Sequence, residues 1–189
     1  LINSFNQHDA KWVLVGDEAL VAAASADLVV FMQQPVAIPA HFTMPVLIND
    51  TIGSFQLPAN DERPIARFCG WPTMVERPGW EMAAYHNTST AWTLDAEKLL
   101  NRKLCVVPNT PGFIAPRILA TIINEACHGL AQNICTADDM DVAMQLGTNY
   151  PKGPIAWMYE IGKENIADLL AALALQEKRY TPHPMLNMK

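Results

Sequence analysis

The spacing of apolar residues changes near residue 107, and this change constrains the fold more than any other feature. Before it, short apolar runs alternate with proline-rich connections, which is typical of buried strands separated by loops. After it, apolar residues recur every three or four positions, which favours amphipathic helices. The sequence therefore predicts an α/β domain over residues 1–107, followed by an all-α domain over residues 108–189. The expected strands cover residues 12–15, 28–32, 45–48, 65–69, 81–85 and 103–107.

The first half has the pattern of a small parallel sheet. Asp17 can cap a short helix over residues 17–26, between the first two expected strands. A strand, a helix and a strand in so short a segment favour a compact βαβ unit with a parallel strand pair. A second helix is expected over residues 93–101, with Ser89 or Thr93 near its start. The connections are short, so we interpret this half as a reduced doubly wound domain.

The second half predicts a bundle of about four helices. Pro111 suits the first position of a helix, where its missing N–H would have no partner in any case. Thr136 and Asp139 have the spacing of a capping box, and Gly147 suits a helix stop. A last helix is expected over residues 164–178. The first helix carries apolar residues at helical spacing, and these predict a wide buried stripe: Ile114, Ile118, Leu119, Ile122, Ile123, Ala126 and Leu130.

Charge and cysteine content exclude several classes of function. The 13 Lys and Arg residues against 19 Asp and Glu residues give a net charge of −6, without a basic block. Binding to nucleic acid or to an anionic membrane surface is therefore not expected. The four cysteines have no C-x-x-C spacing, so we expect reduced thiols and no metal site. The first residues resemble no secretory signal and lack Met, so we expect a cytoplasmic chain cut from a longer polypeptide.

Several collinear motifs in the second half resemble one enzyme family, the 3-hydroxyacyl-CoA dehydrogenases. Asn109–Arg117 resembles the start of the family's helical C-terminal domain, and residues 139–147 resemble its acidic, Ala-Met and Leu-Gly pattern. The later residues 155–157 and 179–182 resemble the branch of 3-hydroxybutyryl-CoA and 3-hydroxyadipyl-CoA dehydrogenases. The residues that carry the resemblance, which we expect to be structural, are Asn109, Pro111, Gly112, Phe113, Arg117, Asn124, Glu125, Tyr150, Pro151, Gly153 and Pro154.

The resemblance implies a fold and an activity. The fold would be a reduced Rossmann-like segment followed by a helical bundle of the 6-phosphogluconate-dehydrogenase C-terminal type. The full-length enzyme would use NAD to oxidise (3S)-3-hydroxyacyl-CoA to 3-oxoacyl-CoA, in fatty acid β-oxidation or phenylacetate breakdown. This segment would pack against a catalytic N-terminal half or a second subunit, in a homo-oligomer that encloses the acyl-CoA substrate.

The family's catalytic residues do not carry over onto this sequence. In the resembling segment, Phe68 takes the position of the family's histidine, and Trp71 and Pro116 take the positions of its asparagines. None of these side chains can transfer a proton. Glu81 is a weak candidate for the family's glutamate, with a one-residue slip. The family's serine falls near Ile52, between the hydroxyls of Thr51 and Ser54.

The nucleotide fingerprint is also missing. A single glycine, Gly16, follows the first expected strand, and Asp17 and Glu18 come next, where the pyrophosphate would need to bind. We therefore expect this chain to bind no NAD and to be inactive alone. Two other hypotheses stay open. One is an active dehydrogenase with a diverged site. The other is a free-standing scaffold or acyl-CoA-binding protein, although no Arg/Lys cluster is present to hold the CoA phosphates.

Overall fold

The computed structural model describes residues 12–14, 26–57, 61–86 and 88–187. The chain forms two compact units. The α/β unit comprises residues 1–70 and 74–113, and the helical unit comprises residues 71–73 and 114–189. A short helix, α1 (Pro72–Val75), lies across the division. The expected helix over residues 17–26 falls almost entirely outside the described residues.

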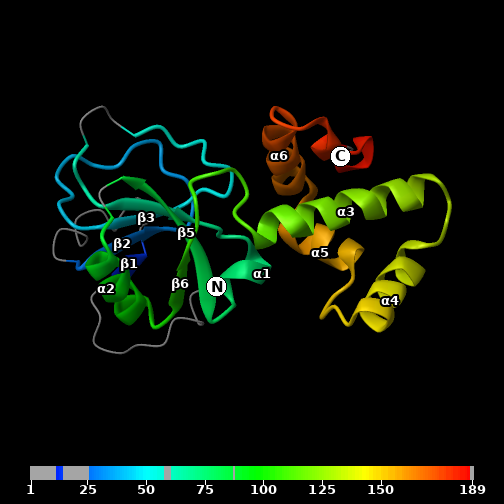
Figure 1. Cartoon of the computed structure of the whole chain (residues 1–189), viewed down its shortest axis with the longest axis horizontal. Coiled ribbons are helices and arrows are strands. Elements are labelled where there is room, and N and C mark those ends of the chain that lie inside the picture. The colour runs from blue at the N-terminus through cyan, green and yellow to red at the C-terminus, as the bar shows by residue number, and fades with distance from the viewer. Residues whose placement is uncertain (1–11, 15–25, 58–60, 87, 188–189) are drawn as a thin grey trace. The chain divides into compact units, whose positions relative to one another are not determined.

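A six-stranded sheet forms the α/β unit, with the strands in chain order (Figure 1). The strands β1 to β4 are parallel, β5 runs antiparallel to β4, and β6 is parallel to β5. All six expected strands are confirmed, and the parallel pairing of the first two is confirmed as well. Their bounds are Trp12–Leu14 (β1), Leu28–Phe31 (β2), Val46–Asn49 (β3), Ile65–Phe68 (β4), Gly79–His86 (β5) and Lys103–Val106 (β6).

Apolar side chains pack on both faces of this sheet, because successive residues of a strand point to opposite sides. Val29 and Val46 belong to one cluster, which loop residues such as Phe42 complete. Leu28 and Leu47 belong to the other cluster. Helix α2 (Thr90–Leu100) covers that second face, and Ser89 caps it by accepting a hydrogen bond from the backbone of Trp92, as expected. Among the described residues, the loop residues Phe42 and Phe55 pack on the first face.

The helical unit contains the four expected helices and two short 3-10 turns. Helices α3 and α6 bury apolar stripes that meet in the core of this unit. Leu119 and Ile123 of α3 are buried, as expected, whereas Ile114 and Ile118 are exposed, because they lie on the other side of the helix. The bounds are Ala115–Ala131 (α3), Ala137–Thr148 (α4), Pro154–Ile161 (α5), Lys163–Ala174 (α6), Lys178–Tyr180 (η3) and Pro184–Leu186 (η4).

Three of the expected helix ends differ from the structure. Helix α3 does not begin at Pro111, because Gly112 and Phe113 have positive φ angles of 83° and 50°, which no α-helix contains. Gly147 does not end α4, since the left-handed residue that ends it is Asn149. The last helix ends at Ala174, four residues earlier than expected. The Thr136–Asp139 cap is confirmed, with the Thr136 hydroxyl accepting a hydrogen bond from the Asp139 N–H at 3.2 Å.

Candidate functional site

A cluster of buried polar side chains lies where strands β3 and β4 end. In open α/β sheets ligands bind outside the carboxyl ends of the strands, so this edge is the natural place to seek a site. Asp50 follows the last residue of β3, Arg67 lies in β4, and Tyr85 lies in the neighbouring β5. Sequence analysis did not single out these three residues. A charge in the apolar run Ile65–Phe68 was the available signal, because an unpaired arginine is seldom fully buried.

The Asp50 carboxylate holds the loop that follows β3. One of its oxygens accepts backbone N–H bonds from Gly53 at 2.7 Å and Ser54 at 3.1 Å. The other oxygen accepts a backbone bond from Phe55 at 2.8 Å and the Tyr85 hydroxyl at 2.5 Å. Gly53 has a φ of 83°, which an L side chain rarely adopts, so this turn depends on glycine. Four donors thus satisfy a single carboxylate.

The Arg67 guanidinium joins this loop to the segment after β6. It is completely buried, and it donates to the carbonyls of Asp50 at 2.9 Å and Thr51 at 3.2 Å. Its other donors reach the Asn109 side-chain oxygen and the Thr110 carbonyl, both at 2.6 Å. The strand-end cluster, as we call Asp50, Arg67, Tyr85 and Asn109, therefore pins residues 109–110 to the sheet. The ring of Phe113 lies 4.4 Å from the guanidinium carbon and covers it.

The electrostatics of the cluster follow from these contacts. Burial raises the pKa of Asp50, but the Tyr85 hydroxyl and three backbone N–H groups outweigh burial and hold the pKa below its usual value. Burial, followed by the hydrogen bond to Asp50, raises the pKa of the Tyr85 phenol well above its usual range. Burial also lowers the pKa of Arg67. The Asp50 carboxylate and the Arg67 guanidinium thus both have their hydrogen-bond partners within the protein.

Phe68, which the sequence comparison aligned with the family's histidine, lies in the hydrophobic core. Phe68 is completely buried and stacks on Trp80, with the ring centres 4.7 Å apart and the planes 8° from parallel. Phe68 pairs with Met82 across the sheet, so the side chain of Glu81, the residue before Met82, points to the opposite face. Glu81 therefore cannot orient a proton-transferring group at position 68. Trp71 is buried, and Pro116 lies in the first turn of α3.

The hydroxyl candidates near position 52 do not converge on a common point. Thr51 is buried and donates to the sulfur of Cys69 at 3.3 Å. Ser54 is exposed and donates to the Gln34 side-chain oxygen at 3.2 Å. Gly16, Asp17 and Glu18, which stand in place of the nucleotide fingerprint, lie outside the described residues.

The residues that carry the family resemblance have structural partners. In the α/β unit, Asn109 accepts from Arg67, and the Gly112 N–H donates to the Thr51 carbonyl at 2.8 Å. In the helical unit, Tyr150 packs near Trp157, with ring centres 5.6 Å apart. Glu125 is exposed on α3, and Pro151 is exposed in the connection to α5.

The start of α5 shows why its motif contains Gly-Pro. The Asp141 carboxylate accepts the N–H groups of Ile155 at 2.8 Å and Ala156 at 2.9 Å, so it caps this helix. A Cβ atom on Gly153 would lie 2.2 Å from the carboxyl carbon of Asp141, so only glycine fits. Pro154 lies in the first turn of α5, where its missing N–H has no consequence.

The Arg67 guanidinium at the ends of β3 and β4 is not available to a nucleotide phosphate. The donors there are bound to the protein's own carbonyls, and the Phe113 ring lies over the guanidinium. No three His, Cys, Asp or Glu side chains of the described chain are grouped so that they could hold a metal ion. In the same described part, no helix has both the length and the apolar character needed to cross a membrane.

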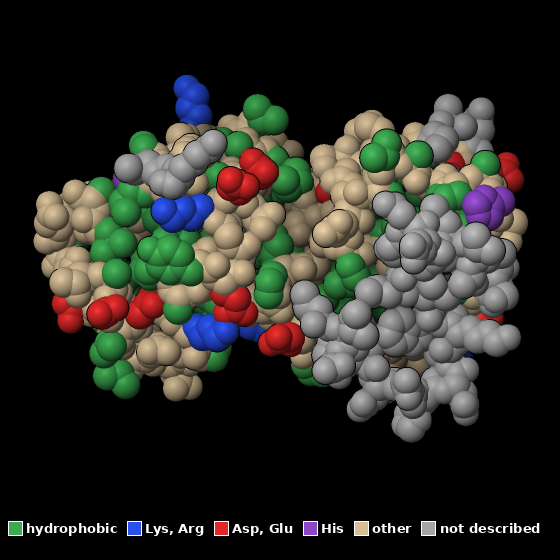
Figure 2. All heavy atoms as spheres, turned by 180° about the vertical axis from the view of Figure 1, so that it is seen from behind, with side chains coloured by type: hydrophobic (Ala, Val, Ile, Leu, Met, Phe, Trp, Pro, Cys, Tyr) green, Lys and Arg blue, Asp and Glu red, His purple; other side chains and the backbone are tan. Residues whose placement is uncertain are grey.

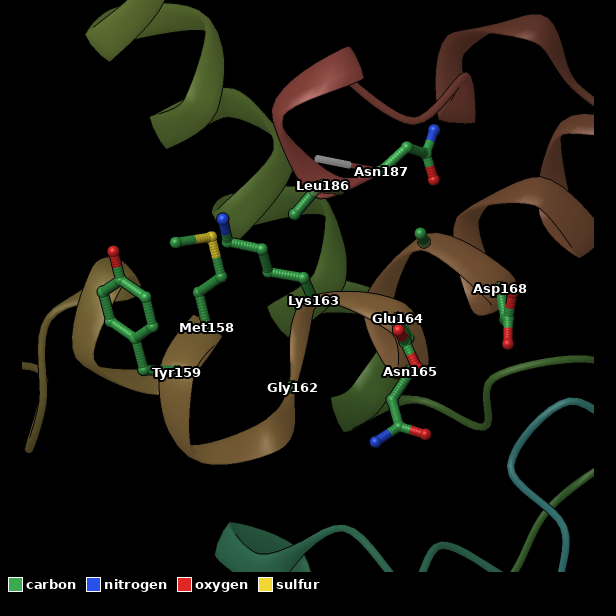
Figure 3. A pocket seen from close by; sticks show the side chains of 10 residues that line it. Met158, Tyr159, Gly162, Lys163, Glu164, Asn165, Asp168, Leu186 and Asn187 are labelled. Atoms are coloured by element: carbon green, nitrogen blue, oxygen red, sulfur yellow. The ribbon is translucent and has the colours of Figure 1, made fainter. Parts of the chain in front are cut away.

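The helical unit has a cavity of about 530 Å³ beside the turn between α5 and α6. Figure 3 shows its lining, in which Met158 and Lys163 face Leu186 of the C-terminal segment. Glu164, Asn165 and Asp168 add polar atoms along α6, so the lining combines both charges with apolar side chains. No pair of these groups forms a recognisable catalytic arrangement.

Comparisons with known proteins agree on one family. Residues 112–189 match the model of the 3-hydroxyacyl-CoA dehydrogenase C-terminal domain. The 3-hydroxyadipyl-CoA dehydrogenase of Escherichia coli is 39% identical over 85 residues, which cover 44% of this chain and 18% of that protein. A 3-hydroxybutyryl-CoA dehydrogenase of Bradyrhizobium diazoefficiens is 31% identical over 162 residues, which cover 81% of this chain. That match covers 53% of the Bradyrhizobium protein. The chain therefore spans about half of the length of one relative and 18% of the length of the other.

A solved structure supports the fold of both units. The (S)-3-hydroxybutyryl-CoA dehydrogenase of Ralstonia eutropha superposes with a TM-score of 0.68 at 19% identity. The match covers 88% of this chain and 65% of the other. The fold, a Rossmann-like sheet followed by a helical domain, is therefore confirmed.

Proposed function

We propose that this chain, whose residues 112–189 match the model of the 3-hydroxyacyl-CoA dehydrogenase C-terminal domain, is the C-terminal portion of an NAD-dependent enzyme that oxidises (3S)-3-hydroxyacyl-CoA to 3-oxoacyl-CoA. In this proposal the segment packs against the catalytic portion and is inactive alone. One observation carries the proposal. The fold resembles that of the family, while Phe68, which we align with the proton-transferring histidine, is stacked in the core.

The substrate and setting follow from the relatives. Their names specify 3-hydroxyadipyl-CoA and 3-hydroxybutyryl-CoA, so we propose a CoA thioester with a short or dicarboxylic acyl chain. Such substrates arise in β-oxidation and in phenylacetate breakdown, so we propose that the enzyme acts in one of these pathways, in the cytoplasm. NAD would bind to the catalytic portion, because the described strand ends of this chain are filled by their own side chains.

Helix α4 offers the surface for this packing. It buries none of its residues within the described structure, unlike α3, α5 and α6. Val142 and Leu146, one helical turn apart, are 51% and 83% exposed. Figure 2 shows hydrophobic side chains at the surface of the helical unit. We propose that the catalytic portion, or a second copy in a homo-oligomer, covers this α4 face and so buries its apolar surface.

The test combines activity and association. The purified chain is mixed with acetoacetyl-CoA and NADH at high concentration, and the absorbance of NADH is followed. We expect no turnover by this chain alone, and turnover by a full-length enzyme of which it is a part. Clear turnover by the chain alone would show that a diverged site is at work and would overturn the proposal.

Association is tested with Leu146→Glu, which places a charge in the α4 face. We expect binding to the catalytic portion, measured by sedimentation velocity, to weaken by tenfold or more, because a buried unpaired charge opposes docking. Val36→Glu is the matched control, since Val36 is fully exposed on a loop of the other unit. Equal effects of the two substitutions would exclude the α4 face as the docking surface.

A further inference from the structure

The C-terminal segment, residues 178–187, lies against helices α3 and α6 as a strap. Tyr180 and Leu186 bury their side chains, with 7% and 1% of their surface exposed. Asn124 of α3 fixes the backbone between them. Its amide nitrogen donates to the Thr181 carbonyl at 3.0 Å, and its oxygen accepts the His183 N–H at 2.7 Å. A single buried side chain of α3 thus forms hydrogen bonds with both a backbone donor and a backbone acceptor of the strap.

Two histidines meet where the strap crosses α3. The imidazoles of His128 and His183 contact edge to face, with ring centres 4.5 Å apart and planes 71° apart. The Nδ1 atom of His183 also accepts the backbone N–H of Met185 at 3.2 Å, and this bond caps the turn η4. The cap requires a neutral His183, because a protonated Nδ1 cannot accept a hydrogen bond.

We propose that the strap is a pH-sensitive closure of the helical unit, which the protonation of His183 against His128 releases. Leu186 and Asn187 line the cavity beside the α5–α6 turn (Figure 3), so release of the strap removes one wall of that cavity. It also uncovers the apolar surface now buried under Tyr180 and Leu186. The proposal is independent of the dehydrogenase activity proposed above.

The charged groups near His128 and His183 lie on the elements that pack against the strap. Helices α3 and α6 pack against η4, and η3 packs against α6. Burial lowers the pKa of His183, and the neighbouring His128 imidazole lowers it further. Arg179 is paired with Glu177 at 2.7 Å. The remaining charged residues on these elements are Arg117, Glu125, Lys163, Glu164, Asp168 and Lys178.

The direction of the pH effect follows from the lowered pKa. The unfolded histidine, with a pKa near 6.5, takes up a proton before the folded one does. The contribution of His183 to closure is therefore complete above about pH 6.5 and is lost as the pH falls through the lowered pKa. Uptake of one proton lowers the equilibrium constant for strap closure by at most about tenfold for each pH unit.

Hydrogen exchange of the complete chain, measured by NMR at about pH 7.5 and about pH 5.5, tests the proposal. Rates are corrected for the pH dependence of intrinsic exchange. We expect the amides of Tyr180, Leu186 and Asn187, which are hydrogen-bonded within the strap, to lose several-fold protection at the lower pH. The amides of α5 should keep theirs, which distinguishes release of the strap from general unfolding.

Two variants separate the closure from a structural contact. His183→Asn keeps a side-chain acceptor at the cap and removes the proton, so protection should no longer depend on pH. His128→Gln removes the ring that His183 contacts and should reduce the loss. An unchanged strap in the natural chain at both pH values would overturn the proposal. So would an equal loss of protection in His183→Asn. Circular dichroism checks that both variants are folded. If His183→Asn does not fold, His128→Gln still tests the proposal.

Discussion

Replacing Arg67 by methionine tests whether the strand-end cluster is a structural lock. The guanidinium donates to three backbone carbonyls and to the Asn109 side chain, all within 3.2 Å. Methionine fills much of the same volume but leaves these four acceptors without their donor. Each unsatisfied acceptor costs about 1 kcal/mol at least, while removal of a buried charge offsets part of the sum. We expect the free energy of unfolding to fall by about 3 kcal/mol.

The assay is urea unfolding followed by tryptophan fluorescence, with Lys98→Met as the matched control. Lys98 forms only an exposed ion pair with Asp95, so its loss should change the stability by less than about 0.5 kcal/mol. Arg67→Met should also lower Tm by about 6–12 °C in a chain of this size. Arg67→Lys should fall between the two, because one ammonium group cannot reach all four acceptors. A loss below about 1 kcal/mol for Arg67→Met would refute the reasoning.

Three further predictions follow from neighbouring contacts. Tyr85→Phe removes a hydrogen bond to the Asp50 carboxylate, so the free energy of unfolding should fall by about 1.5–3 kcal/mol at neutral pH. The pKa of Asp50 is lowered in the folded protein, so its ionised form stabilises the fold fully above the pKa of the unfolded chain. The difference between the two proteins should therefore shrink as acid protonates Asp50. Gly153→Ala places a methyl group against Asp141, and we expect a loss of about 1–2 kcal/mol in thermal unfolding. Phe68→His should destabilise the core and restore no NADH oxidation, because the side chain at position 68 is completely buried.

Each of these predictions has its own counter-result. An acid-unfolding midpoint identical in Tyr85→Phe and the natural chain would show that the phenol does not hold Asp50 ionised. Gly147→Ala is the control for Gly153→Ala, since no atom lies within 4 Å of a Cβ at position 147, and similar effects at the two sites would contradict the steric argument. Measurable turnover by Phe68→His would mean that a substrate reaches this strand.

The sequence predicts the elements of this fold better than their relations. Runs such as Leu28–Phe31 are apolar on both sides, which is sufficient to identify buried strands. The reversed direction of β5 is not visible in the sequence, because apolar spacing is the same for parallel and antiparallel strands. Pro111 was expected to begin a helix, but the left-handed residues Gly112 and Phe113 intervene. Their conformation depends on Arg67, which is distant in the sequence and packs against the Phe113 ring.

The candidate site shows the same division between local and distant information. The loss of proton-transfer chemistry at position 68 could be inferred from the residue type alone. The cluster that occupies the strand ends could not, because its four members come from four separate strand or loop segments that only the folded sheet assembles. The buried charge of Arg67 indicated a partner without identifying it. Likewise, nothing local to Asn124 predicts that it binds residues 57 and 59 positions further along the chain.

The order of the strands has a consequence for how the chain folds. Each strand of the sheet pairs with the strand that precedes it in the sequence, from β1 through β6. Each described strand after β1 can therefore pair with a strand that has already been synthesised, and none of them has to insert between two others. Loop closure is then short at every step, which favours rapid folding. We expect the sheet to assemble progressively from its first strand during synthesis, with β6 closing it just before the helical unit emerges.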